Sequence, residues 1–332
     1  MNLSNLSNLS NFNLFIIIGL VVILFIILIK RFKPQKIESF DNIKLNIGNE
    51  LSTYFHDFGA ALLNKEDFIL YKQYDNIPFF RYLPKVLKYN DHKDLYEKMI
   101  NGRNGNDKLD NTFINKYTCS TCLWENHNTK IEFFWLCMKP YVYKIINDAL
   151  IKDNLKKKID YATIIHFRCA DAPINRHMSY HFQKYIFFKE AIDNIKNTTN
   201  VYNENNKILI MYNNVHRSDD NNKNACNVYA GELKKYIEKL GYSVDIHSES
   251  NIKDFATLFY APSVISTGSS FSYMSGFFGG NKFISAGHYT EINLDTKCTD
   301  CDDSEWLIKD YDINHKEIKD YYNTEEVINM LK

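Results

Sequence analysis

The segment His166-Phe167-Arg168-Cys169-Ala170-Asp171 combines residue types that bind phosphates, and it follows an apolar, strand-like run. In open α/β sheets the ligand-binding loops lie at the carboxyl ends of the strands. His166 and Arg168 share one side of the strand if it stays extended, and an arginine there can contact two phosphate oxygens. Phosphate binding is one interpretation of this segment. A structural pair in which Asp171 neutralises Arg168 is the other.

A second candidate is the hydroxyl-rich turn Ser266-Thr267-Gly268-Ser269-Ser270-Phe271-Ser272, between a predicted strand and a predicted helix. Backbone N–H groups at the start of a helix, with the positive end of its dipole, form an anion site. The spacing is neither that of a P-loop nor that of a Rossmann glycine fingerprint, which argues against an ATPase or a dehydrogenase. An ordinary helix cap by serine or threonine is the alternative interpretation.

A third candidate, Asn46-Ile47-Gly48-Asn49-Glu50-Leu51, reads as a small loop directly before the first globular helix. Glycine in such a loop lets the backbone approach a ligand closely. Asn49 or Glu50 would then point into a cleft between two domains. The alternative is an ordinary turn that leads into the helix.

The elements that must position these residues are clearest from residue 160 onward, where apolar strand-like runs alternate with amphipathic helix-like runs. This alternation indicates a mostly parallel sheet with helices packed on its faces. We expect strands at 161–167, 208–212, 243–246, 263–266 and 282–285. We expect helices at 180–196, 225–240, 254–260, 271–278 and 323–331, with Gly241 as a left-handed cap. The predicted architecture is of a nucleotide-binding type.

The first half of the chain has a weaker pattern. It predicts a helix at 51–63, a strand at 68–71, a long polar loop at 101–130 and a long helix at 141–157. A charged stretch near 155–160 suits a domain boundary. We therefore expect two α/β domains that face each other across a cleft.

Together the three candidate segments resemble the fucosyltransferase superfamily, which has the two-domain GT-B fold. Its members carry a Gly-Asn-Gln type loop early in the chain, a His-x-Arg-Arg-x-Asp motif and a late Ser-Phe-Ser turn. The likeness extends from about Gly48 to Ala286 and is most specific at 164–171 and 264–275. Two positions depart from the pattern, since Glu50 stands where the family often has Gln and Cys169 where many members have a second Arg. The first concerns the acceptor chemistry and the second the identity of the sugar.

The resemblance implies an inverting transfer of fucose, or another sugar, from a GDP-sugar donor to a glycan or protein hydroxyl. It implies that Arg168 holds the donor pyrophosphate, that His166 lies near the nucleoside and that Asp254 accepts hydrogen bonds from guanine. The implied donor-binding residues are His166, Arg168, Asp171, Asp254, Ser269, Ser270, Phe271 and Ser272. The implied catalytic residues are Arg168, Asn49 and Glu50. The implied domains are an acceptor-side α/β domain at 46–157 and a donor-binding domain at 158–332, both Rossmann-like.

Such a site would act mainly by electrostatics, because fixed donors stabilise the charge that develops on the departing diphosphate. We expect no metal and no other cofactor. Glu50, His56 and the departing phosphate are alternative acceptors for the proton of the acceptor hydroxyl. The pair His177 and His181 lacks an evident third metal ligand, and the Asp-x-Asp segments at 300–302 and 310–312 read as solvated loops.

The N-terminus contains a run of 16 apolar residues at 14–29, close to the lower limit for a membrane-spanning helix. We predict a polar tail at 1–13, a transmembrane anchor at 14–30 and a linker at 31–45. A cleaved signal peptide is the alternative, but basic residues follow the run where a small-residue cleavage site would stand. These same residues favour a cytosolic globular part, whereas enzymes that glycosylate secreted proteins face the endomembrane lumen.

Composition and cysteine spacing argue against some classes of partner and metal site but indicate no activity. Basic and acidic residues number 40 each, so we expect no nucleic-acid partner. The pairs Cys119-Ser-Thr-Cys122 and Cys298-Thr-Asp-Cys301 are far apart for one zinc site and favour local disulfides or free thiols. Three alternative functions stay open: a GT-B transferase for another nucleotide sugar, an inactive membrane-tethered carbohydrate-binding protein suggested by Cys169, and a metal-binding scaffold.

Overall fold

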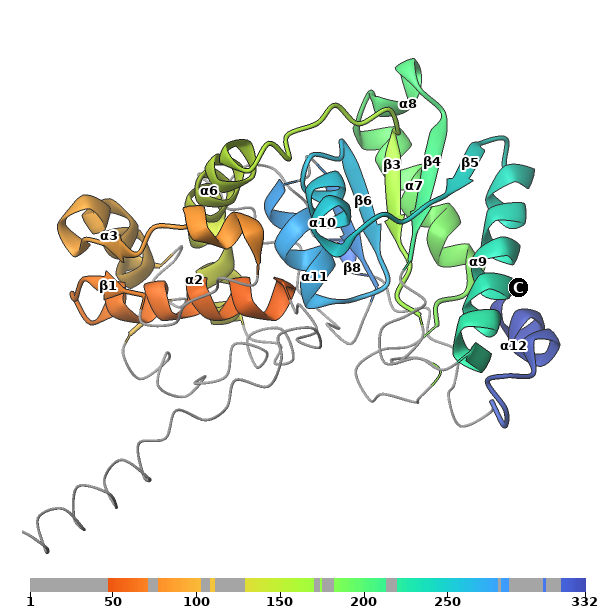
Figure 1. Ribbon diagram of the computed structural model, residues 1–332, viewed down its shortest axis with the longest axis horizontal. Helices are drawn as coiled ribbons and strands as arrows, with labels where there is room; N and C mark the ends of the chain where they lie inside the picture. The colour runs from red at the N-terminus through yellow and green to blue at the C-terminus, as the bar shows by residue number, and fades with distance from the viewer. Residues whose placement is uncertain are drawn as a thin grey trace, which may run out of the picture. The chain divides into compact units, whose positions relative to one another are not determined.

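A six-stranded parallel sheet is the centre of the computed structural model (Figure 1). The structure describes residues 47–70, 77–102, 108–110, 129–169, 174, 182–212, 220–279, 282–286, 307–308 and 318–332. The predicted tail, anchor and linker lie outside these residues. Within the described ranges, no helix is both long and apolar enough to cross a membrane.

The strand order is β5-β4-β3-β6-β7-β8, and every neighbouring pair is parallel. The strands are β3 (Thr163–His166), β4 (Lys207–Met211), β5 (Ser243–Ile246), β6 (Ser263–Ser266), β7 (Lys282–Ser285) and β8 (Leu307–Ile308). Counted from β3, this is the order 3-2-1-4-5-6 of doubly wound nucleotide-binding sheets. The α/β prediction is therefore confirmed, and only the short β8 was not predicted.

Both faces of the sheet are buried, because side chains alternate along each strand between two cores. Ile165 of β3 packs in the core that contains α7 (Tyr185–Thr198), α9 (Asp220–Lys239) and α12 (Thr324–Leu331). Ile164 packs in the opposite core, with α10 (Asn251–Phe259). The remaining elements of this half are α8 (Val201–Glu204), α11 (Ser270–Ser272) and η4 (Tyr273–Phe277), a π-helix. Gly241, with φ of +95°, follows α9 as the predicted left-handed residue.

The first half is built differently from the prediction. It contains α2 (Ile47–Leu63), β1 (Phe68–Ile69), η2 (Pro78–Tyr82), β2 (Val86–Leu87), η3 (Tyr89–His92), α3 (Lys93–Asn101) and α6 (Thr129–Lys152). Its β1 and β2 pair antiparallel, and the described part of 46–157 holds no second parallel sheet. The Rossmann-like character predicted for this half is thus absent from the described residues.

The helices of the first half bury their apolar faces against the sheet half. Trp135 of α6 contacts Phe278 edge to face, with ring centroids 5.5 Å apart. Phe55 of α2 shares one core with Val264 of β6. In Figure 1, α10 and α11 lie between the sheet and the helices α2 and α6. One core therefore crosses the boundary expected near residues 155–160, and Leu45–Lys332 forms one compact unit.

Helix α6 begins twelve residues before the predicted 141–157 helix and ends at Lys152. Pro140 lies inside this helix, although proline usually begins or breaks one. Met138 and Val142 on either side of it are both fully buried, so packing holds one continuous helix. Asn154, with φ of 56°, then ends the helical path.

Candidate functional site

Two of the three predicted segments meet where the strand order reverses. From β3 the chain continues to β4 and β5 on one side, and from β6 to β7 and β8 on the other. His166 and Ser266 pair in register at the carboxyl ends of β3 and β6, and the Thr267 N–H donates to the His166 carbonyl at 3.1 Å. Open α/β sheets bind their ligands at this kind of switch point.

The third predicted segment joins the same edge from the distant N-terminal half. The Ser270 hydroxyl donates a hydrogen bond to the Asn49 side-chain oxygen, across 221 positions of sequence. Gly48 lies against the backbone of the turn, because a β-carbon there would be 2.4 Å from the Phe271 nitrogen. The structure thus brings all three segments together.

The prediction of a loop at 46–51 is wrong for residues 47–51, which the structure describes as helical. Ile47 to Glu50 form the first turn of α2, and Gly48 allows helix-to-turn packing rather than ligand approach. The missed signal is the helical spacing of Ile47, Leu51, Phe55 and Phe58, all of which are buried. Gly48 and its polar neighbours masked this periodicity.

Arg168 is half-buried two residues beyond the end of β3. Its backbone N–H donates to the Thr267 hydroxyl at 2.7 Å, which fixes the start of the loop against the β6 end. Asp171 lies outside the described residues, so the alternative pairing of Arg168 with Asp171 stays a prediction. Arg168 therefore lies at the carboxyl end of β3, the edge at which open α/β sheets place their ligand-binding loops.

His166 is buried, with 8% of its surface exposed, and its ring lies 5.6 Å from the ring of Phe271. Burial, and secondarily the charge of Arg168, lower the pKa of His166 to about 3. The imidazole is therefore neutral at physiological pH. Its Nδ1 atom is buried and has no hydrogen-bond partner among the described residues.

The serine turn caps its own helix. Ser269 accepts a hydrogen bond from the Ser272 N–H at 3.2 Å, and the Ser266 and Ser272 hydroxyls lie 2.7 Å apart. The side chains of Ser269 and Ser272 are buried, so these two predicted phosphate contacts serve the cap instead. Ser270 is only half-buried, and Phe271 presents its ring to His166. The adjoining π-helix η4 is a feature frequent at functional sites.

Asp254 lies in the first turn of α10 and is 6% exposed. One carboxylate oxygen accepts from the Ser248 hydroxyl at 2.5 Å and the other from the Glu249 N–H at 2.8 Å. Burial raises the pKa of Asp254, and these two hydrogen bonds oppose the shift. The ring of the next residue, Phe255, contacts the ring of Phe271 edge to face, with centroids 5.6 Å apart. This contact links the first turn of α10 to the serine turn at the switch point.

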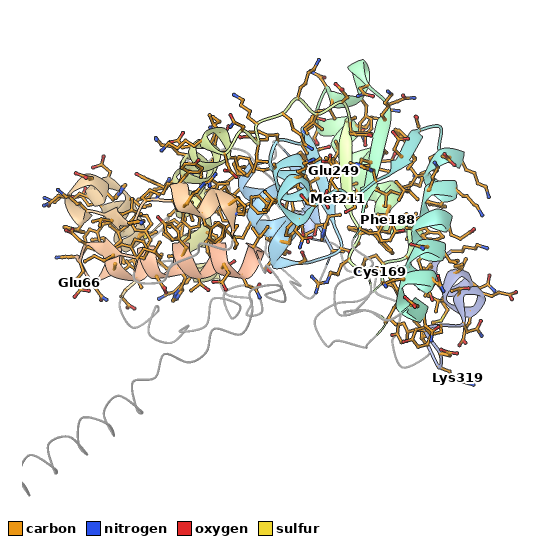
Figure 2. The ribbon with its side chains drawn as sticks, viewed as in Figure 1. Glu66, Cys169, Phe188, Met211, Glu249 and Lys319 are labelled. Carbon is orange, nitrogen blue, oxygen red and sulfur yellow. A yellow bond between two sulfur atoms is a disulfide. The ribbon has the colours of Figure 1, made fainter. Side chains whose placement is uncertain are left out.

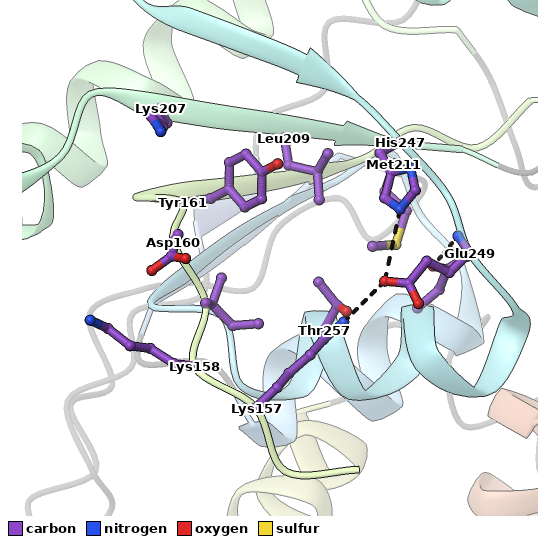
Figure 3. Close-up of a pocket in the computed structure, with 12 residues that line it drawn as sticks. Lys157, Lys158, Asp160, Tyr161, Lys207, Leu209, Met211, His247, Glu249 and Thr257 are labelled. Carbon is purple, nitrogen blue, oxygen red and sulfur yellow. Dashed lines mark hydrogen bonds and ion pairs between the residues drawn. The ribbon is translucent and has the colours of Figure 1, made fainter.

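Asp254 also lines a pocket of about 340 Å³ that extends along β4 from Lys207 at its start to Met211 at its end (Figure 3). Leu209 and Met211 of β4 contribute apolar walls, and Met211 pairs in register with His166. Charged and polar residues around the pocket include Lys157, Lys158, Asp160, Lys207, His247 and Glu249. The volume is typical of a small-molecule site. Sequence reasoning missed the contribution of residues 157–161, because they read only as a charged linker.

Glu249 is the centre of a small charge cluster at this pocket. Its carboxylate lies 3.5 Å from Lys157 Nζ, 3.0 Å from Lys253 Nζ and 3.8 Å from His247 Nε2. The hydrogen bond from Lys253 is the main cause that lowers the pKa of Glu249. Lys157 thereby connects the segment before β3 to the β5–α10 loop (Figure 3).

The two candidate bases of α2 differ in environment. Glu50 is half-buried in the first turn, close in sequence to Asn49. His56 is buried, with Nδ1 3.2 Å from an Asp57 oxygen and with Nε2 lacking a hydrogen-bond partner among the described residues. Neither arrangement selects the base.

Cys169 forms a disulfide with Cys226 of α9, 57 residues later in the chain (Figure 2). No spacing motif predicts this pair, which only the packing of α9 behind β3 brings together. Cys137 is buried and belongs to no disulfide among the described residues. The two C-x-x-C pairs, His177, His181 and the Asp-x-Asp segments lie outside the described residues. Within the described residues, no three potential metal-ligating side chains cluster.

The described residues include an arginine and a helix start at the switch point and, along β4, a pocket of about 340 Å³. Arg168 and the helix that begins at Ser270 supply positive potential, and the pocket at Asp254 supplies apolar walls and a carboxylate. Asn49 brings an amide group from the other half to the same edge. No protein-family model, curated protein or solved structure matches this chain.

Proposed function

We propose that this chain is a metal-independent, inverting glycosyltransferase that uses a GDP-sugar donor, with fucose as the first candidate sugar. The observation that carries the proposal is the contact between Asn49 and Ser270 at the switch point. Three segments that together resemble those of fucosyltransferases lie far apart in sequence, yet they meet at one edge of the sheet. In the proposal residues 46–157 serve the acceptor, although their described part is not a second Rossmann-like domain, and residues 14–30 anchor the chain in a membrane.

In the proposed reaction the acceptor oxygen attacks the anomeric carbon while the bond from that carbon to the diphosphate breaks. The electron pair of the broken bond goes to the diphosphate, where Arg168 and the positive end of the Ser270 helix stabilise it. The acceptor proton goes to Glu50, to His56 or to the diphosphate itself. His166 contributes a neutral imidazole that can hydrogen-bond to the donor but adds no charge.

The pocket at Asp254 is the proposed site of the base. Leu209 and Met211 suit the apolar faces of a purine, and the Asp254 carboxylate suits N–H donors on its edge. Guanine has adjacent ring and exocyclic N–H donors on one edge, which adenine and uracil lack. The pocket therefore supports GDP over ADP and UDP.

The alternative of an inactive carbohydrate-binding protein rests on Cys169. Cys169 stands where many fucosyltransferases have arginine, which suggested a decayed catalytic site. The disulfide with Cys226 gives Cys169 a structural role that is compatible with activity.

Calorimetry on the full chain in detergent, with GDP, UDP and ADP, tests the donor assignment. We expect GDP to bind most tightly and Arg168→Ala to weaken its binding. Arg81→Ala is the matched control, because Arg81 is exposed and paired with Asp153 at 2.7 Å. Equal affinity for the three nucleotides, or none, would refute the donor class. GDP binding without hydrolysis of GDP-fucose and without transfer would favour a binding protein.

A further inference from the structure

Cys169, the residue that follows Arg168, is joined by a disulfide to Cys226 of α9, which packs on the face of the sheet opposite to α10. Cys169 and Cys226 are 2% and 0% exposed, and their Cα atoms lie 5.9 Å apart. Both belong to the core beneath α9, together with Phe182 and Tyr229. The cross-link therefore lies within the packed core rather than at an exposed loop tip.

The backbone on either side of Arg168 is anchored at the end of the sheet. The Phe167 N–H donates to the Met211 carbonyl at 2.9 Å, which is the last contact of the β3 strand with β4. The Arg168 N–H then donates to Thr267 at 2.7 Å. One residue later the disulfide fixes the chain, so Arg168 is held between a hydrogen bond and a covalent bond.

We propose that the Cys169–Cys226 disulfide is a positioning device for Arg168, so that phosphate binding at the switch point depends on the oxidation of this pair. The inference rests on the proposed function, in which Arg168 holds the donor diphosphate. Arginine binds phosphate best when its planar group is preorganised for a two-pronged contact. A loop released by reduction would present Arg168 in several arrangements, and only one of them fits the diphosphate.

Formation of the Cys169–Cys226 disulfide requires an oxidant and an oxidising compartment. The two thiols lose two electrons and two protons when the sulfur–sulfur bond forms, and a thiol–disulfide oxidoreductase in its disulfide form accepts them. Such bonds persist in oxidising compartments and are rare in the cytosol. The disulfide thus places the globular part on the lumenal side of a membrane, opposite to the side favoured by the basic residues after the apolar run.

The test measures GDP affinity of the full chain in detergent, before and after treatment with dithiothreitol. If the loop keeps the binding arrangement one-tenth of the time after reduction, the apparent dissociation constant rises about tenfold. The variant Cys169→Ser/Cys226→Ser should show the same weak binding without treatment and no further response to the reductant. The control Cys137→Ala, which removes a buried thiol outside this disulfide, should keep the response of the parent chain.

The Arg168→Ala background separates positioning from general stability. There, reduction should not weaken GDP binding further, because the group that the disulfide positions is already gone. A structural role alone would lower affinity in both backgrounds, and that result would overturn the inference. If Arg168→Ala leaves GDP affinity unchanged, the proposed function fails; if it weakens binding while reduction does not, only the positioning role fails.

The double cysteine variant could fail to fold, so the parent chain carries an independent measurement. Peptide mass analysis without reductant should find residues 169 and 226 in one linked species. Tyrosine fluorescence during reduction reports whether the fold persists while affinity falls. Two separate thiols in active protein that has not been treated with reductant would overturn the inference without any variant.

Discussion

Replacing Gly48 by alanine would place a methyl group inside the backbone of the Ser270–Phe271 turn. The added carbon would lie 2.4 Å from the Phe271 nitrogen, 2.5 Å from the Ser270 carbonyl carbon and 2.7 Å from the Phe271 Cα. All three neighbours are backbone atoms, so no side chain can rotate away. An ordinary contact starts at 3.4 Å, and α2 must therefore move about 1 Å from the turn.

The expected energy change follows from two opposing effects. Overpacking costs about 3 kcal/mol for a contact with rigid backbone. Alanine gains about 1 kcal/mol over glycine in helix propensity. We therefore expect Gly48→Ala to lower the free energy of unfolding by about 2 kcal/mol. The same displacement breaks the Asn49–Ser270 hydrogen bond, and a shift of about 1 Å at a catalytic centre can cost roughly 100-fold in turnover.

Urea unfolding and a sugar-transfer assay measure the two effects on one preparation. Gly231→Ala in α9 is the matched control, because a β-carbon there meets nothing within 4 Å. That change should leave turnover unaltered and stabilise the fold by roughly 0.5–1 kcal/mol. A Gly48→Ala protein as stable and active as its parent would refute the packing argument. Loss of stability with unchanged turnover would show that the α2 contact is structural only.

Three further changes test the proposed site. Arg168→Ala should reduce turnover at least roughly 100-fold while the protein stays folded, and Arg168→Lys should rescue it only in part, since an ammonium cannot make a two-pronged contact. A lower melting temperature with unchanged nucleotide affinity would instead assign Arg168 to a structural pair. His166 has a folded pKa of about 3, below the unfolded value, so the unfolded state binds more protons and stability falls as pH drops from about 6.5 toward 3. Against a His166→Gln variant, which lacks this titration, urea unfolding should show an excess loss on the order of 3 kcal/mol at pH 4; parallel pH profiles would contradict the burial argument. A fragment that begins near Ile37 should stay soluble and folded, because the described cores use none of the apolar run; aggregation of the fragment beside a well-behaved full chain would mean that the run packs into the fold.

The second half of the chain could be predicted because its strands are short, apolar and buried on both faces. Strands β5, β6 and β7 have the predicted bounds, and the shift of α7 by a few residues leaves the topology unchanged. The first half could not, because α2 and α6 pack on another part of the chain rather than on a sheet of their own. No local pattern states that Phe55 and Trp135 belong to the core of β6.

Some residues of the candidate site could likewise be predicted from the sequence, and others could not. Arg168 and His166 could be placed from the sequence, because the end of a buried strand is a local feature. The capping role of Ser269 and Ser272 was foreseen only as an alternative, since a cap and an anion site share one composition. The pocket at Asp254 depends on β4, α10 and the segment before β3 coming together. That arrangement is a property of the folded chain alone.

The membrane orientation and the chemistry of Cys169 are one question. Basic residues after the apolar run favour a cytosolic globular part. This positive-inside rule is a statistical bias in how segments insert, so it does not fix the orientation of one protein. In the cytosol the Cys169–Cys226 pair would stay reduced, and the residue after Arg168 would lose its covalent link to α9. In the lumen the bond forms, and Asn197, exposed near the end of α7 within Asn197-Thr198-Thr199, becomes an acceptor for glycosylation. A glycan on Asn197 and a linked peptide with Cys169 and Cys226 should therefore occur in the same protein, and either one without the other would break this reasoning.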